Sequence, residues 1–194
     1  MTFVYFASSN ENKLLEIQSL FENQNKENKE NIEILFSNLA IKEIQSESII
    51  EVAEDKAKKA FNAIKKPVIV EDDGLFIDGL NGFPGIYASF VFKTIGNKGI
   101  LNLLGSNKNR RAHFLSVFSF YDGKTIETFN GQTAGHITTE IFPKGWGFDP
   151  IFKPEKEDKT YGELNILRKN EISHRSKAFR QFLTWHKLKY NHQS

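Results

Sequence analysis

The chain has 194 residues, 39% of them hydrophobic, which suffices for one sizeable core and leaves little room for a second independent domain. Its 26 basic and 24 acidic residues nearly balance, so the overall charge argues against a nucleic-acid-binding protein. Because the chain contains no cysteine, disulfides, a thiolate nucleophile and a cysteine-ligated zinc ion are excluded. We predict a single domain over residues 1–194.

The beginning of the chain does not resemble a signal peptide, because it lacks a basic start, a long apolar core and a small-residue cleavage site. No apolar run approaches the length of about 20 residues that a membrane helix requires. We therefore expect no membrane partner and a cytoplasmic location.

An apolar run over residues 2–7 predicts a buried strand that ends in a polar loop. Apolar residues then recur at helical spacing over 14–21, with Ser9 or Asn10 available as the N-cap. The polar, repetitive stretch 22–31 predicts a solvated helix end and loop. The order strand, loop, helix is typical of phosphate-binding sites.

The following segments alternate between strand and helix patterns. We predict a strand over residues 32–36, a helix over 48–64 and a second strand over 67–70. Glycines punctuate the chain after Asp78, and a helix is predicted over 98–104. This alternation indicates an α/β protein.

A β-rich block comes next, because Asp122-Gly123 is a strong hairpin signal between apolar runs. We predict strands over 113–121, 125–130 and 133–141, and their antiparallel pairing would make the sheet mixed. The irregular stretch 145–150 follows, and the last predicted elements are helices over 161–167 and 176–190.

Three consecutive carboxylates, Glu71, Asp72 and Asp73, follow the apolar strand pattern of 67–70. Carboxylates crowded at a strand end repel one another, and a divalent cation would relieve that repulsion. Magnesium takes hard oxygen ligands and neutralises phosphoryl oxygens, while a spare carboxylate can activate water. The alternative is a simple polar turn.

The loop after the first predicted strand offers hydroxyls, a helix N-terminus and the ammonium of Lys13, which together could bind an anion. The alternative is an ordinary N-cap followed by a surface lysine. Near the C-terminus, Lys169, His174 and Arg175 could donate hydrogen bonds to a phosphate or a base carbonyl, or could form a solvated helix start. Trp146 could stack on a purine or belong to the core.

Four blocks, in order along almost the whole chain, resemble the inosine triphosphate pyrophosphatase family, house-cleaning enzymes for ITP, dITP and XTP. They are SSNENKLLEI, VEDDGLFIDGLNGFPGIY, GWGFDPIFKP with TYGEL, and KNEISHR. The resemblance implies an α/β fold, with an elongated mixed sheet flanked by helices and two lobes around a central nucleotide cleft. It also implies a Mg2+-dependent hydrolase that converts these triphosphates to the monophosphate and pyrophosphate, and a homodimer.

The resemblance also assigns residues. It implies that Asp72 is the general base and that Glu43 and Asp72 bind magnesium, with Glu71 as a further candidate ligand. The triphosphate would lie against the first loop and Lys56, and Trp146 would stack on the base. The implied substrate-binding residues are Ser8, Ser9, Asn10, Glu11, Asn12, Lys13, Lys56, Asp73, Trp146, Gly147, Phe148, Asp149, Lys169, His174 and Arg175.

This sequence departs from the family pattern at a few positions. Asp73 stands where many relatives have serine, Ser9 where glycine is usual, and Gly162 where alanine is frequent. The rival readings are a Maf-type nucleotide pyrophosphatase with another base preference and a nucleotide-binding protein that has lost catalysis. A nucleic-acid binder fits poorly with the near-neutral charge and the acidic cluster.

Overall fold

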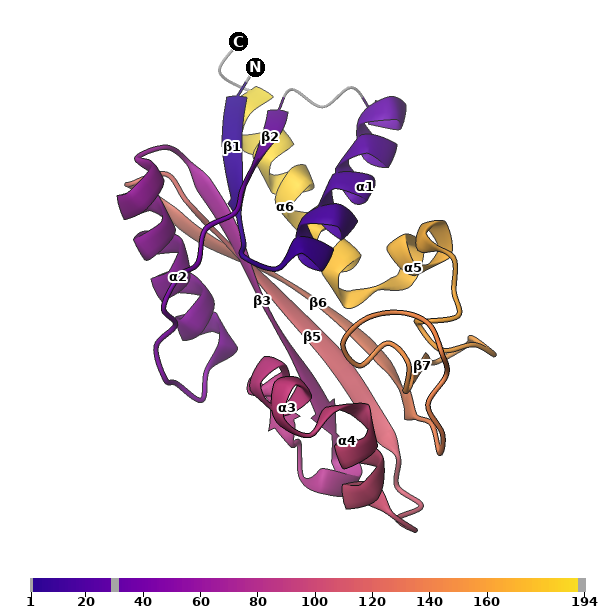
Figure 1. Ribbon diagram of the computed structural model, residues 1–194. Coiled ribbons are helices and arrows are strands. Elements are labelled where there is room, and N and C mark those ends of the chain that lie inside the picture. The colour runs from indigo at the N-terminus through magenta and orange to yellow at the C-terminus, as the bar shows by residue number, and fades with distance from the viewer. Residues whose placement is uncertain (1, 29–31, 192–194) are drawn as a thin grey trace. The chain divides into compact units, whose positions relative to one another are not determined.

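The computed structural model describes residues 2–28 and 32–191, and shows a mixed α/β fold (Figure 1). The strands are β1 (Thr2–Ala7), β2 (Ile32–Ser37), β3 (Val68–Ile77), β4 (Pro84–Gly85), β5 (Arg111–Tyr121), β6 (Ile126–Ile137) and β7 (Phe152–Pro154). The helices are α1 (Glu11–Asn28), α2 (Ile49–Ile64), α3 (Ala88–Thr94), α4 (Gly96–Leu104), α5 (Ile166–Ile172) and α6 (His174–Asn191), with a short 3-10 helix η1 (Asp78–Leu80).

The strands form a sheet in the order β2-β1-β3-β5-β6-β7, with β4 paired to β3. β1 runs parallel to β2 and to β3, whereas β4 and β7 run antiparallel to β3 and β6. The prediction of a mixed sheet in an α/β protein is therefore confirmed. No helix in the described part of the chain is long and apolar enough to cross a membrane.

Contacts along the chain define two compact units, each assembled from segments that are distant in sequence. Unit 1 comprises residues 1–72, 116–131 and 175–194, and unit 2 comprises residues 73–115 and 132–174. Strands β3, β5 and β6 contribute residues to both units.

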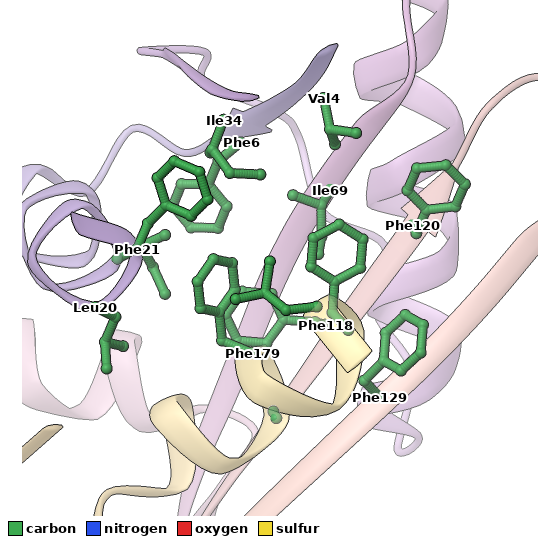
Figure 2. Close-up of a cluster of buried hydrophobic side chains, with 14 of the residues drawn as sticks. Val4, Phe6, Leu20, Phe21, Ile34, Ile69, Phe118, Phe120, Phe129 and Phe179 are labelled. Atoms are coloured by element: carbon green, nitrogen blue, oxygen red, sulfur yellow. The ribbon is translucent and has the colours of Figure 1, made fainter. Parts of the chain in front are cut away.

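Unit 1 has apolar side chains on both faces of its strands, because neighbouring strand residues point in opposite directions. One cluster gathers Val4, Phe6 and Ile69 with α1 and α6, and it includes several phenylalanine rings packed against one another (Figure 2). The other cluster packs residues such as Val68 and Val70 against α2. α1 and α6 thus lie on one side of β1, and α2 lies on the other (Figure 1).

Helix α2 forms where the spacing of apolar residues predicts it. Its buried side chains recur at helical intervals, and Ser48 caps its start by accepting a hydrogen bond from Glu51 N at 3.3 Å. Lys65 ends the helix in the left-handed conformation, with φ of 59°. This local order positions the lysines of α2, which matter for the site below.

Unit 2 has its own core, to which β3, α3, α4, β5, β6 and β7 all contribute. Phe114 belongs to this core, with the Phe152 ring 4.7 Å away in an edge-to-face arrangement. Leu75 and Ile77, at the end of β3, are fully buried in this core. The segment after residue 73 is therefore anchored by apolar packing of its own.

Several secondary-structure predictions differ from the structure. β3 does not end at Val70 but continues to Ile77, so the three carboxylates lie within the strand. β6 is one strand, not two separated near residue 131. The helix predicted over 161–167 begins only at Ile166, where Asn165 Oδ1 caps it by accepting from Arg168 N at 2.8 Å, and α3 was not predicted.

Candidate functional site

The loop after β1 caps the start of α1. Ser8 Oγ accepts a hydrogen bond from Asn10 N at 3.1 Å, and Asn10 Oδ1 accepts from the backbone N–H groups of Asn12 and Lys13 at 3.0 and 3.3 Å. Asn10 is therefore the N-cap. Ser9 is not among the described residues with positive φ, so a serine replaces the usual glycine here without backbone strain.

Lys13 is not a surface lysine, because it belongs to a buried ion cluster of unit 1 formed by Lys13, Glu16, Glu71 and Arg175. Arg175 Nε lies 3.0 and 3.1 Å from the two carboxylate oxygens of Glu71, and Arg175 Nη1 donates to Glu16. Lys13 Nζ lies 3.3 Å from Glu71 Oε2, and Ser116 Oγ donates to Glu71 Oε1 at 2.8 Å. Two cations thus balance two carboxylates, which is what makes buried charges tolerable.

The contacts of two residues in this cluster bear on the roles expected for them. The Glu71 side chain is completely buried, and its oxygens are taken by Arg175, Lys13 and Ser116 rather than directed to solvent. The guanidinium of Arg175, expected to donate to a base or a phosphate, is engaged with Glu71 and Glu16.

Sequence reasoning missed Glu16 and Ser116 as members of this group. A signal for Glu16 was present, since Lys13, Glu16, Ile17 and Leu20 recur at the spacing of one helix face and are all buried. Charged residues on the apolar face of a helix need partners inside the protein. Nothing in the sequence points to Ser116.

A second group in unit 1 brings together Glu43, Lys56 and Asp72. Lys56 Nζ lies 2.7 Å from Glu43 Oε1 and 3.9 Å from Asp72 Oδ1, and it donates to the backbone carbonyl of Glu71 at 3.2 Å. The side chains of Lys56 and Asp72 are 12% and 13% exposed, whereas that of Glu43 is 48% exposed. The two carboxylates expected to hold magnesium therefore converge on one positive charge.

This donor set fits Mg2+. The ion prefers hard oxygen ligands and is commonly held by one or two carboxylates together with substrate phosphates. The described residues contain no cluster of three or more acidic, histidine or cysteine side chains that could hold a metal alone. Glu43 and Asp72 could hold the ion only with oxygens from elsewhere, such as those of a bound phosphate.

In unit 2, Trp146, Asp149 and Lys169 lie together. Lys169 Nζ is 2.6 Å from Asp149 Oδ2, and both side chains are less than a tenth exposed. The same ammonium lies 5.4 Å from the ring centres of Trp146 and Tyr161, within the range of a cation–π contact. Trp146 itself is only partly buried, so part of its ring is accessible.

The loop carrying Trp146 is attached to the core of unit 2 at its next two residues. Phe148 is a core aromatic, 4% exposed, with its ring 5.4 Å from that of Phe92. The carbonyl of Gly147 accepts a hydrogen bond from Asn97 Nδ2 at 3.0 Å, and Gly147 has a φ of 58°. Asn97 had not been singled out from the sequence.

His174 and Asp73 complete the group in unit 2. The His174 ring stacks on Phe114 at 4.5 Å, and its Nε2 lies 3.9 Å from Asp73 Oδ2. Asp73 and Asp72 are neighbours in a strand, so their side chains point to opposite faces. Asp73 thus lies near an imidazole, whereas Asp72 lies near the Lys56 ammonium.

The predicted site residues divide between the units. Unit 1 holds Ser8, Ser9, Asn10, Glu11, Asn12, Lys13, Glu43, Lys56, Asp72 and Arg175. Unit 2 holds Asp73, Trp146, Gly147, Phe148, Asp149, Lys169 and His174.

The fold and the group around Lys56 define a mixed α/β protein whose paired carboxylates and ammonium groups suit phosphoryl chemistry. Solved structures share this fold. A Ham1 protein from Staphylococcus aureus superimposes with a TM-score of 0.79 at 28% identity, covering 96% of this chain and 99% of that one. A HAM1 protein from Coxiella burnetii gives 0.81 at 29% identity, covering 95% and 98%.

The sequence comparisons agree. The model of the Ham1 family matches residues 4–185, and the chain therefore belongs to the Ham1 family. It is 42% identical over 183 residues to a dITP/XTP pyrophosphatase of Thermococcus kodakarensis, covering 93% of this chain and 95% of that protein. A dITP/XTP pyrophosphatase of Pyrococcus horikoshii is 40% identical over 191 residues, covering 96% and 99%.

Proposed function

We infer that this protein is a nucleoside triphosphate pyrophosphatase that converts the non-standard purine nucleotides ITP, dITP and XTP to the monophosphate and pyrophosphate. The relatives named dITP/XTP pyrophosphatase, which match nearly the whole chain, support the reaction and the substrate class. The observation that carries the proposal is the convergence of Glu43 and Asp72 on the Lys56 ammonium.

Asp72 is the general base in this proposal. Its carboxylate accepts a proton from a water molecule while the water oxygen attacks the α-phosphorus, and the bond to the bridging oxygen of the β-phosphate breaks. Pyrophosphate leaves, so no covalent enzyme intermediate forms. Glu43 and Asp72 would hold Mg2+, which when bound neutralises phosphate charge and orients the phosphate oxygens.

Lys56 stabilises negative charge close to Asp72. Its Nζ is fixed by the Glu71 carbonyl at 3.2 Å and by Glu43 at 2.7 Å, so the ammonium is already oriented before substrate binds. The N-terminal end of α1 adds the positive end of the helix dipole, which attracts the phosphates.

Base recognition falls to the group around Lys169. Trp146 offers an aromatic face for stacking, and Lys169, held by Asp149 at 2.6 Å, can donate to the 6-oxo group of hypoxanthine or xanthine. Adenine has an amino donor at that position and would leave a buried polar group unpaired. This costs on the order of 1 to 3 kcal/mol per group, which disfavours ATP.

We also propose a homodimer. In unit 2, Phe83, Tyr87 and Phe90 are 40%, 51% and 67% exposed, and a second copy of the chain would cover such apolar surface. Light scattering after size-exclusion chromatography should give twice the chain mass. A Phe90→Glu variant should shift the protein toward the monomer, and a wild-type monomer at all concentrations would refute the dimer.

A substrate screen tests the proposed reaction directly. With Mg2+, the purified protein should release pyrophosphate from ITP, dITP and XTP much faster than from ATP. In water labelled with heavy oxygen, the label should appear in the monophosphate, because the attack is at the α-phosphorus. Label in the released pyrophosphate would contradict the proposed attack at the α-phosphorus. Faster turnover of pyrimidine triphosphates would contradict the proposed substrate class and favour the Maf-type alternative.

A further inference from the structure

The segment that carries Glu43 has no helix or strand of its own. It connects β2 to α2 over residues 38–48, and residues 42–45 are exposed. Leu39 and Ile41 pack against the α2 side of the unit 1 core, so the exposed part begins directly after the last apolar anchor. Apolar packing therefore does not fix Glu43, and polar contacts must do so.

Two lysines of α2 provide these contacts. Lys56 and Lys59 are three residues apart and therefore lie on the same face of the helix. Lys56 Nζ contacts the Glu43 carboxylate at 2.7 Å, and Lys59 Nζ donates to the backbone carbonyl of Lys42 at 2.9 Å. The Glu43 residue is thus held at its side chain and at the peptide bond that precedes it.

The two contacts respond differently to a bound cation. A metal ion bound by Glu43 would compete with Lys56 for the Glu43 carboxylate. The contact of Lys59 uses a backbone carbonyl and is unaffected by that competition. Asp55, one helical turn before Lys59, lies 2.6 Å from its Nζ and restricts the ammonium to this position.

We propose that Lys59 is a positioning residue that holds the Lys42 carbonyl and thereby keeps the Glu43 carboxylate in place for Mg2+. This inference rests on the proposed function, in which Glu43 is a metal ligand. Lys59 touches neither metal nor substrate. Its effect should appear in the metal requirement and in the order of the segment 38–48, while the chemical step itself remains intact.

The test compares two variants. Lys59→Met removes the ammonium donor but keeps a long, unbranched side chain, and Lys58→Met makes the same change at the exposed neighbouring position of α2. Both variants lose one positive charge. Without metal, hydrogen exchange measured by mass spectrometry should be faster over residues 38–48 in Lys59→Met only. Lys59→Arg, which keeps a donor, should restore slow exchange.

The metal requirement is the second readout. The Mg2+ concentration for half-maximal pyrophosphate release from dITP should rise about tenfold in Lys59→Met, as for other residues that orient metal ligands. The kcat at saturating Mg2+ should stay within about twofold of wild type, because no group that contacts the transition state is lost. Lys58→Met should match wild type in both quantities.

Two results would overturn the inference: unchanged exchange over residues 38–48, or faster exchange with an unchanged metal requirement. A wild-type protein that releases no pyrophosphate would instead refute the proposed function. In that case Mn2+ binding, followed by electron paramagnetic resonance, replaces turnover as the metal readout. Equal Mn2+ affinity in Lys59→Met and Lys58→Met would then refute the role of Lys59.

Discussion

Replacing Glu71 with glutamine should destabilise the protein far more than an equivalent change at the surface. Glu71 is the acceptor on which the buried ion cluster depends, with Arg175 Nε at 3.0 and 3.1 Å, Ser116 Oγ at 2.8 Å and Lys13 Nζ at 3.3 Å. Glutamine preserves the shape and one acceptor oxygen but removes the charge. Arg175 then keeps its contact with Glu16, but Arg175 and Lys13 both lose the negative charge of Glu71.

The size of the effect follows from burial. The side chains of Glu71 and Arg175 are 0% and 1% exposed, so neither water nor salt can replace the lost charge. Breaking a buried ion pair by removing one partner costs about 3 to 5 kcal/mol. Because glutamine still accepts one hydrogen bond, we expect the free energy of unfolding to fall by about 3 kcal/mol, at the lower end of that range.

Urea unfolding followed by circular dichroism measures this loss, with Glu171→Gln as the matched control. Glu171 pairs with Arg168 at 2.7 Å on the exposed side of α5, where solvent screens the charges. The control should keep the wild-type midpoint, whereas Glu71→Gln should unfold at clearly lower urea. Equal midpoints for the two variants would refute the reasoning about the buried cluster.

Three further predictions concern other parts of the chain. Gly162→Ala should raise the KM for dITP. The added Cβ would lie 1.8 Å from the Lys144 carbonyl oxygen and must therefore displace the loop that leads to Trp146. An unchanged KM would contradict this reasoning. Asn97→Ala, which frees the Gly147 carbonyl, should alter the fluorescence of Trp146 in a background that lacks Trp185, and an unaltered spectrum would count against that contact. Burial and the nearby Lys189 lower the pKa of His186 from 6.5 to about 4 in the folded protein. Between these two pH values the unfolded chain binds a proton at His186, whereas the folded protein does not. Wild-type stability should therefore fall between pH 6.5 and about 4 more steeply than that of His186→Gln, and parallel curves would refute this.

Local patterns were sufficient for the elements that begin and end with clear signals. Neighbouring residues in the sequence determine the apolar stripe of α2 and its cap at Ser48. They also determine the apolar run that forms β1. The same holds for the turn at Asp122, whose Oδ1 accepts from the backbone N–H groups of Lys124 and Thr125 at 2.9 and 2.7 Å. These parts of the fold could be predicted because their causes lie within a few residues.

The length of β3 could not be predicted, because its cause is distant in sequence. Three acidic residues followed by glycine look like the end of a strand, yet Glu71 is buried there because Arg175, 104 residues later, neutralises it. The strand β6 was also predicted to be interrupted, at Gly131 and Gln132. Gly131 instead lies buried within the continuous strand, because a glycine can continue a strand as well as end it.

The candidate site was predicted only in part, again because some of its contacts join residues that are far apart in the sequence. The resemblance to a family identified Glu43, Lys56 and Asp72, and the structure brings these three together within unit 1. It did not reveal that Arg175 is engaged by Glu16 and Glu71, because ion pairing inside a core depends on tertiary packing. The catalytic role of each residue stays a prediction.

The most direct test of the central claim is the turnover of dITP by Asp72→Asn at saturating Mg2+. Asparagine keeps the size of the side chain but cannot accept a proton from water, so kcat should fall by at least about a hundredfold while the urea midpoint is unchanged. A variant that folds normally and retains most of the wild-type kcat would contradict the assignment of Asp72 as the general base.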